Sequence, residues 1–461
     1  MQVSKLEKSV GIEVFITSSL GVGGIIRDNI EDFIVEEVLV DGSKAQTDRT
    51  VDSGDARALD SSLTRNRYLI CVLTKRNWDT LSAVKAVADH IGVNVGRVQI
   101  AGLKDARAVT AQHITIEDVS IDDVRGVKIK DIELYPVGYF HSRLSSFYLF
   151  GNRFNITIRS ISHSESATRK RTARIAEELG SVGGVPNFFG HQRFGTTRPI
   201  THLVGKAIIQ GNLPKAALLF LAKPSPYEHS ASREARETLH RTRDFKQALS
   251  EFPRHLRYER VMIKHLAEEP EDYVGAFRRL PLKLRELFVQ AYQSCLFNRF
   301  LSRRIAAGLP LNRAENGDYV VSVQRSGLPM ASMYKMVGDE NIVEVNKAIT
   351  AGKMRLALPL IGFKQHPSRG FQGEIERAIL EEESVEMARF KVAAIPEICL
   401  RGELRCALTP LRDFAVDGIS KEPVDASKCK MGLSFMLYRS SYATVVLREL
   451  MKPRSPIRSG F

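Results

Sequence analysis

The chain of 461 residues is predicted to be an α/β protein, more narrowly α+β, in which a β-rich domain is interrupted by a mainly helical insertion. Runs rich in Val, Ile, Thr and Phe occur before about residue 185 and again after about residue 397, as is typical of strands. Between these parts, apolar residues recur at helical spacing up to about residue 305. The length fits two or three domains, each able to bury a core.

The first elements follow from local patterns. Residues 25–40 predict a strand, because an apolar triplet precedes alternating Glu and Val. Residues 41–66, rich in Asp, Ser, Thr and Arg, predict a loop. A buried strand is expected at 68–73, and Asp79 is a suitable N-cap for the helix that follows. The apolar positions of that helix are Leu81, Val84, Val87, Ala88 and Ile91.

The later elements alternate in character. Residues 152–159 carry apolar side chains at every second position, which places them on one face of a strand. Residues 186–195 are rich in glycine and aromatic residues and form the junction to the helical region. A long helix is predicted over 284–304. Residues 310–396 mix short strands and helices, and β character resumes at Arg401.

Composition limits the partners and the compartment. The net charge of +14 favours a polyanionic partner, most commonly nucleic acid. Five scattered cysteines without a Cys-x-x-Cys pair argue against a disulfide framework or a zinc knuckle, and favour buried thiols in a reducing compartment. Neither a signal peptide nor a long uncharged apolar run is present. We therefore expect a cytoplasmic protein with no membrane partner.

Motifs for metals and cofactors are missing from the sequence. It contains no His-Glu-x-x-His and no EF-hand loop, and its eleven histidines are dispersed. The glycine-rich stretch 21–24 lacks the Gly-Lys-Ser/Thr of a P-loop. These observations favour a site built on a carboxylate, with no cofactor and no metal.

The best candidate for that carboxylate is Asp105. A β-branched run ends at Ile100, a Gly-Leu-Lys-Asp turn follows, and a second Thr- and Ile-rich run starts near Thr110. The turn sets Asp105 between Lys104 and Arg107, and nearby positive charge favours an ionised carboxylate, available as nucleophile or base. Taken alone, the segment favours a turn aspartate that bonds its own backbone, and only the rest of the chain reverses that preference.

Six sequence blocks, in family order, resemble the TruD family of tRNA pseudouridine synthases over nearly the whole chain. They include Gly-Leu-Lys-Asp, Gly-Asn-Arg-Phe and Val-Pro-Asn-Phe-Phe-Gly-His-Gln-Arg-Phe-Gly. The large insertion resembles the longer archaeal and eukaryotic branch of the family. The blocks lie at 31–37, 102–105, 151–154, 185–195, 290–298 and 442–450.

The resemblance implies a pseudouridine synthase core with a mixed, mostly antiparallel sheet and flanking helices. Residues 1–186 and 397–461 would form this catalytic domain, and 187–396 the inserted domain, with an RNA-binding cleft between the two. The implied activity is isomerisation of uridine to pseudouridine in tRNA, at position 13 of the D-arm. One flipped uridine would enter the site, and no obligate protein partner is expected.

The resemblance also assigns roles to residues. Asp105 matches the catalytic aspartate, and Asn152 and Phe154 match residues that hold the site together and stack on the base. Of the two cations Arg27 and Lys104, one is expected to hold Asp105 ionised and the other to contact phosphate. The further residues expected to bind RNA are Arg107, Arg193 and Tyr442, with Arg198 beside Arg193 in the cleft.

Two of these residues, and the basic run of the chain, also fit purely structural roles. Phe154 fits a core residue of an alternating strand, and Asn152 fits a turn cap. The basic run 233–264 fits a solvated helical face as well as a phosphate-binding one.

The chain departs from the family pattern at three positions. Arg27 stands where lysine is usual, Phe147 where glycine is usual, and Leu437-Tyr438-Arg439-Ser440 replaces Leu-Pro-x-Gly. Arginine and lysine are not interchangeable in a tight site. These departures motivate the alternative of an RNA-binding or chaperone protein that has kept the fold and lost turnover. A metal-dependent nuclease is a third reading, which no ligand cluster supports.

Overall fold

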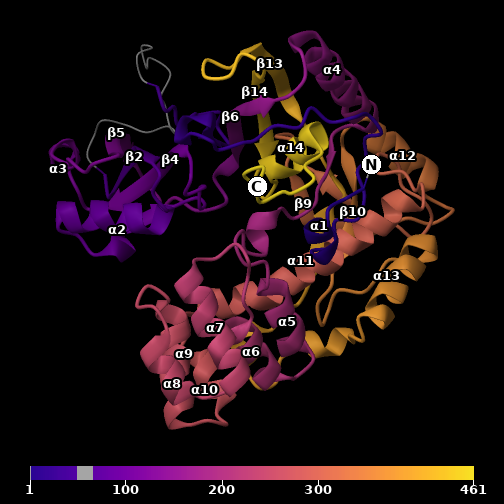
Figure 1. The fold of residues 1–461 in the computed structure, drawn as a ribbon. Coiled ribbons are helices and arrows are strands. Elements are labelled where there is room, and N and C mark those ends of the chain that lie inside the picture. The colour runs from indigo at the N-terminus through magenta and orange to yellow at the C-terminus, as the bar shows by residue number, and fades with distance from the viewer. Residues whose placement is uncertain (1, 49–65) are drawn as a thin grey trace.

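The computed structural model describes residues 2–48 and 66–461 (Figure 1). Its largest sheet has eight strands in the order β13-β14-β6-β1-β4-β2-β5, with β3 paired to β4. Only β1 and β4 run parallel among the described pairs of this sheet, which confirms the expected mixed, mostly antiparallel arrangement. The strands are β1 Phe33–Leu39, β2 Tyr68–Arg76, β3 Val98–Ile100, β4 Val109–Glu117, β5 Ile132–Phe140, β6 Leu149–Ile161, β13 Arg412–Lys421 and β14 Cys429–Tyr438.

The sequence patterns explain most of these strands. The alternate apolar residues of β6 are buried, as predicted. The first strand is shorter than the expected 25–40, because Arg27 adopts a left-handed conformation with φ of 57° and a 3-10 turn precedes Phe33. β2 runs past the expected 68–73 to Arg76. The loop expected at 41–66 lies mostly outside the described residues.

Helices cover one face of the large sheet. α2 packs on β2 and β4, and α4 and α14 pack on β6 and β14, so that two apolar clusters lie side by side on this face. Asp79 caps α2 as predicted, accepting a hydrogen bond from the Ser82 backbone N–H. Leu81 of this helix is exposed. The helices of this part are α1 Lys5–Ser9, α2 Thr80–Ile91, α3 Ile121–Arg125, α4 Glu165–Val182 and α14 Ala443–Met451.

The middle of the chain builds a second core around the long helix α11, which confirms the helix predicted over 284–304. Figure 1 shows α5–α10 gathered on the side of the molecule away from β13 and β14. The helices are α5 Thr201–Ile209, α6 Leu213–Ala222, α7 Ser230–Thr242, α8 Phe245–Glu251, α9 Arg257–Glu268, α10 Tyr273–Arg278, α11 Leu282–Ala306, α12 Ile342–Thr350 and α13 Gly370–Glu382.

A smaller sheet lies beside these helices, in the order β11-β10-β8-β9. Because β11 pairs with β10, strand pairing of the inserted part continues past residue 397. The division of the chain at residues 186 and 397 stays a prediction. The strands are β8 Tyr319–Val323, β9 Pro329–Met336, β10 Met354–Leu360 and β11 Glu403–Cys406, with a separate pair β7 Val185–Pro186 and β12 Leu408–Thr409.

The N-terminal segment ties the two cores together. Val10 and Ile12 are buried in the core around α11, and Asn298 of that helix donates to the Val10 carbonyl at 3.0 Å. A few residues away, Glu7 forms a buried ion pair with Arg448 of α14, at 2.8 Å. The same short segment is therefore anchored in both parts of the molecule.

The cysteines agree with the expectation of buried thiols, with one exception. Cys71, Cys295, Cys406 and Cys429 are buried, and Cys399 is half-buried. No helix in the described part of the chain is long and apolar enough to span a membrane.

Candidate active site

The turn that carries Asp105 joins β3 to β4 and is clamped from three sides. The Lys75 ammonium donates to the backbone carbonyl of Asp105 at 2.7 Å and to that of Trp78 at 2.6 Å. The Lys104 backbone N–H donates to the Thr80 hydroxyl at 3.0 Å. On the other side, the Gln112 amide donates to the Gly102 carbonyl at 3.2 Å. The backbone of this turn is thus fixed by side chains of β2, α2 and β4.

The Asp105 carboxylate forms an ion pair with Arg27 at 2.7 Å. The Arg27 side chain is 8% exposed and that of Asp105 is 30% exposed, so the carboxylate keeps an open side. Arg27 lies over the Phe33 ring at 4.0 Å and donates to the Gly460 carbonyl at 3.1 Å. Burial lowers the pKa of Arg27 and the charge of Asp105 opposes this shift. A guanidinium at this distance stabilises the charged form of a carboxylate.

Of the other two cations expected around Asp105, Lys104 points away from it and Arg107 stays beside the turn. Lys104 forms an ion pair with Glu37 at 2.7 Å, with side chains 3% and 0% exposed. Burial acts to raise the pKa of Glu37, but Lys104 and His113 lower it below its usual value. Lys104 thus does not face solvent where a phosphate would bind, in contrast to the expectation for the second cation. Arg107 is exposed beside the turn.

A row of side chains across five strands forms the floor below Arg27 and Asp105. Lys75, Thr110, Val35, Phe154 and Phe435 pair in register from β2 through β4, β1 and β6 to β14. Side chains at paired positions point to the same face of a sheet. Val35, Phe154 and Phe435 belong to the apolar cluster under α14, and Leu73, two residues from Lys75, belongs to the one under α2. The polar end of the row, Lys75 and Thr110, therefore lies at the boundary between the two cores.

Phe154 is a core residue in this structure. It is 4% exposed, and its ring lies 6.3 Å from that of Phe33, edge-on, and 5.4 Å from that of Phe435, stacked. The core reading of this position is therefore confirmed. Stacking on a base stays a prediction, because it requires the ring edge to line a pocket.

Two buried polar atoms on this sheet face lack a protein partner. They are the Thr110 hydroxyl and the Asn152 side-chain oxygen, and Arg27 Nε nearby is in the same state. Buried polar groups are nearly always hydrogen-bonded. Atoms without a partner beside an accessible carboxylate are therefore available to a polar ligand.

Sequence reasoning missed Lys75 and Thr110. The signal for Lys75 is a lysine at the end of a run that is otherwise apolar from Tyr68 to Leu73. In the structure Lys75 is fully buried, and burial lowers its pKa to about 8, partly offset by the charges of Asp105 and Asp79.

Arg193 and Tyr442 lie together, apart from the Asp105 turn. Both line a cavity of about 630 Å³, together with Phe189, whose ring is 6.1 Å from that of Tyr442. Arg193 donates to Gln290 at 3.0 Å and to the Ser294 hydroxyl at 3.3 Å. No ion pair or hydrogen bond of the described residues joins either side chain to Asp105.

The sequence predicted that Arg198 lines the cleft beside Arg193. In the structure it does not. It donates to the carbonyls of Phe220 at 2.8 Å and Lys223 at 3.1 Å, and burial lowers its pKa to about 10. Within the basic run, Arg236 is likewise buried between Glu228 and Glu259. These two arginines fix helices to one another.

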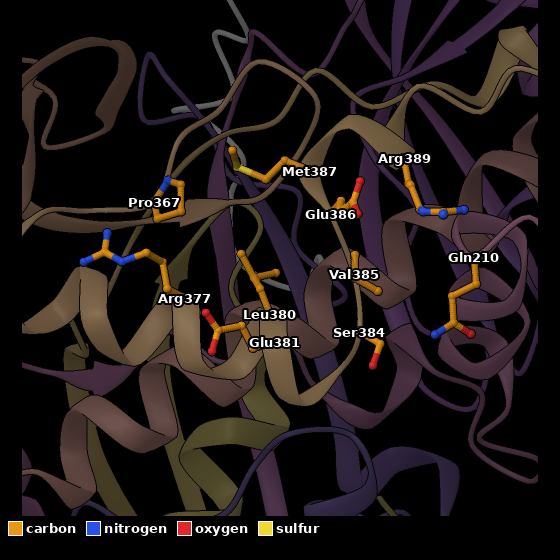
Figure 2. A pocket seen from close by; sticks show the side chains of 10 residues that line it. All are labelled: Gln210, Pro367, Arg377, Leu380, Glu381, Ser384, Val385, Glu386, Met387 and Arg389. Carbon is orange, nitrogen blue, oxygen red and sulfur yellow. The ribbon is translucent and has the colours of Figure 1, made fainter.

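A larger hollow, of about 780 Å³, is far from this chemistry (Figure 2). Its labelled side chains come from α13, from the segments before and after it, and from Gln210 at the end of α5, and none of the predicted site residues lines it. Its lining combines apolar residues with scattered polar and charged ones, namely Gln210, Arg377, Glu381, Ser384, Glu386 and Arg389. A hollow without a cluster of reactive groups gives no reason to locate catalysis there.

Two of the departures from the family pattern have structural correlates. Ser440 has φ of 66°, a conformation that glycine adopts without strain and that is uncommon for other residues. Phe147 is 82% exposed, on the loop whose backbone carbonyls accept from Arg439. Among the residues that the structure describes, no group of three or more His, Cys, Asp or Glu side chains is placed to hold a metal ion.

Comparison with known proteins gives a consistent result. The family model described as tRNA pseudouridine synthase D (TruD) matches residues 9–450. A relative from Methanosarcina mazei, named "Probable tRNA pseudouridine synthase D", is 40% identical over 452 residues, covering 98% of each chain. One of the same name from Thermococcus onnurineus is 38% identical, covering 95% of this chain and 97% of its own. A crystal structure from Methanosarcina mazei under the TruD name aligns with a TM-score of 0.81 at 39% identity, covering 98% of this chain and 99% of its own.

Proposed function

Because this chain belongs to the tRNA pseudouridine synthase D (TruD) family, we propose that it isomerises one uridine of tRNA to pseudouridine, at position 13 of the D-arm. Asp105 is the proposed catalytic residue. The observation that carries this proposal is the ion pair of Asp105 with Arg27 at 2.7 Å, on a turn with a partly exposed carboxylate. We further propose that the reaction takes place in the cytoplasm.

The reaction needs a carboxylate and little else. The N1–C1′ bond of uridine breaks, the uracil turns, and a C5–C1′ bond forms while the hydrogen on C5 is lost to solvent and N1 gains one. An ionised Asp105 either attacks C1′ or removes the C2′ proton, and both routes start from the same charged group. Arg27 keeps that group charged until it reacts by either route.

The uridine has to leave its stack before it reaches Asp105, which costs a few kcal/mol. An aromatic side chain offsets part of this, by about 1–3 kcal/mol per stacked base. Phe154 is our candidate for this contact, through its ring edge. The oxygens of Thr110 and Asn152, which lack a protein partner, are candidates for hydrogen bonds to the polar edge of uracil.

The tRNA backbone is proposed to lie between the catalytic domain, 1–186 with 397–461, and the inserted domain, 187–396. Arg107 and Arg193 are proposed phosphate contacts, because both are near the proposed path and neither is used in an ion pair among the described residues. Tyr442 is proposed to contact RNA on the same path. No protein partner enters this proposal.

The test compares wild type with Asp105→Asn on an unmodified tRNA transcript, mapping pseudouridine by chemical labelling and measuring binding in parallel. Asp122→Asn, at an exposed carboxylate of α3, is the matched control. We expect wild type and control to modify one uridine, and Asp105→Asn to bind tRNA without modifying it. If wild type also binds tightly and leaves the RNA unmodified, the protein is an RNA-binding module instead. Strand cleavage that a chelator stops would indicate a nuclease.

A further inference from the structure

The cavity next to Tyr442 concentrates positive charge. Four arginines line it, and Glu403, which is exposed, is the one carboxylate in its described lining. Within the described residues, none of the four arginines is in an ion pair, since their hydrogen-bond partners are neutral amides, hydroxyls and carbonyls. The four are Arg193, Arg401, Arg405 and Arg439.

Without an anion in the cavity, the buried positive charge of Arg405 costs free energy. Its guanidinium lies 4.0 Å over the Phe189 ring and donates to the Asn187 and Ser440 carbonyls at 3.0 and 2.8 Å. Burial, with a smaller contribution from the charge of Arg193, lowers its pKa to about 10. A buried cation is normally paired. Here the cavity itself is the open side on which a negative group would fit.

The rest of the lining fits a nucleotide. Tyr442 offers aromatic surface, and Gln290 and Gln293 contribute amides to the lining. The volume of about 630 Å³ is within the range of about 300–1,000 Å³ of pockets that enclose small organic ligands, so the space exceeds that of a lone phosphate. Arginine with aromatic surface is a common combination for phosphate and base together.

The cavity also lies on the path of the proposed active site. Asn152 pairs in register with Leu437 of β14. Two residues on, Arg439 leaves the end of that strand and lines the cavity, followed by Ser440 and Tyr442. The cavity therefore begins close to Asn152, one of the residues proposed for the active site.

We propose that this cavity is a second nucleotide-binding site, which holds the phosphate and base of an RNA nucleotide that flanks the target uridine. The inference rests on the proposed function, because it takes tRNA as the ligand. The target uridine binds at Asp105, and the flanking nucleotide is held by Arg193, Arg401 and Arg405. Two binding sites for neighbouring nucleotides of one RNA strand would determine which uridine reaches the carboxylate.

The experiment removes one charge without disturbing the fold. Arg401 is exposed, and no described hydrogen bond uses its side chain, so Arg401→Gln is a suitable variant. Arg193→Gln is the second variant. Arg125→Gln on α3, with a side chain 70% exposed, is the matched control. Dissociation constants for an unmodified tRNA transcript are measured from low to high salt, and the same proteins are titrated with uridine 5′-monophosphate.

Each lost phosphate contact should lower the slope of log affinity against log salt by about 0.7–0.9, equal to about five- to eightfold in affinity at 0.1 M relative to 1 M salt. We expect this for Arg401→Gln and Arg193→Gln and not for Arg125→Gln. An unchanged slope for tRNA in both variants overturns the inference. So does a loss confined to the free mononucleotide, which would make the cavity a small-molecule site. Failure of the proposed function is recognised separately, as tRNA binding by wild type without pseudouridine.

Discussion

The Lys75 ammonium donates at 2.7 Å to the backbone carbonyl of Asp105, thirty positions further along the chain. The lysine is fully buried, and among the described residues no carboxylate is in an ion pair with it. Its two described acceptors are the carbonyls of Asp105 and Trp78. The charge is thus placed under the turn that carries the proposed catalytic carboxylate, and it acts on the position of that turn.

Lys75→Met should lower the rate of pseudouridine formation much more than it lowers tRNA affinity. Without the ammonium, two carbonyls lose their donor and the turn is free to shift, and a displacement of about 1 Å is enough to reduce a rate on the order of 100-fold. Single-turnover kinetics and binding measured on the same preparation check this. Lys85→Met, at an exposed lysine of α2, is the control, and equal losses in both variants would exclude a role for Lys75.

Lys75 should also make the free energy of unfolding depend on pH in a specific way. Burial lowers its pKa to about 8, whereas in the unfolded chain it stays near 10.5. Between these values the unfolded state binds more protons, so the contribution of Lys75 to stability rises with pH. The difference in free energy of unfolding, wild type minus Lys75→Met, should increase by about 3 kcal/mol from pH 8 to 10.5. A difference that stays constant or decreases contradicts this account.

Arg27 should act through its charge more than through its shape. Arg27→Gln removes the cation beside Asp105 and should reduce the rate by about 10²–10³, the range for loss of one preorganised electrostatic contact. Arg27→Lys restores the residue usual in the family and should retain a rate within about tenfold of wild type. Single-turnover rates of the two variants decide this. Equal rates for Gln and Lys would show that the ion pair has no part in the reaction.

Phe154→Leu should reduce turnover while tRNA affinity stays close to that of wild type. Leucine keeps most of the buried apolar surface but removes the ring that packs between Phe33 and Phe435. Alanine at this position is less informative, because it would cost about 3–5 kcal/mol of stability. Phe435→Leu, in the same row of the sheet, controls for the packing loss. If both variants lose rate equally, Phe154 has no contact with the base.

Two helical glycines should respond to alanine in opposite directions. A Cβ at Gly205 of α5 would lie 1.9 Å from the Phe288 carbonyl oxygen of α11, so Gly205→Ala should lower the free energy of unfolding by about 1–3 kcal/mol or more. A Cβ at Gly180 of α4 meets nothing within 4 Å, and Gly180→Ala should raise it by about 0.5–1 kcal/mol. Chemical denaturation of both variants measures this. A free energy of unfolding that is unchanged or raised in Gly205→Ala would contradict the close contact of α5 with α11.

Local patterns predicted those parts of the fold that depend on neighbours in the chain. The cap at Asp79, the alternation in β6 and the long helix α11 were all readable, because each depends on residues a few positions apart. The direction of side chains could not be predicted from such local patterns. Lys104 is adjacent to Asp105 in sequence but points to Glu37, and Arg198 is close to Arg193 but is buried under α6.

The missed residues have a common physical reason. Lys75 and Thr110 reach the site only because β2, β4, β1 and β6 align in one register, and pairing across strands is not encoded in any short segment. The same holds for β11, which resumes β character as expected but pairs with β10 of the inserted part. By contrast, the turn at 102–105 was recognisable from the family motif alone.

The most direct test of the account follows the hydrogen on C5 of uridine. Forming the C5–C1′ bond displaces that hydrogen, so a tRNA transcript labelled with tritium at C5 reports the reaction itself. We predict that wild type releases one tritium per tRNA molecule and that Asp105→Asn, folded and binding the same tRNA, releases none. Release by Asp105→Asn at the wild-type rate would contradict the assignment of Asp105 as the catalytic residue.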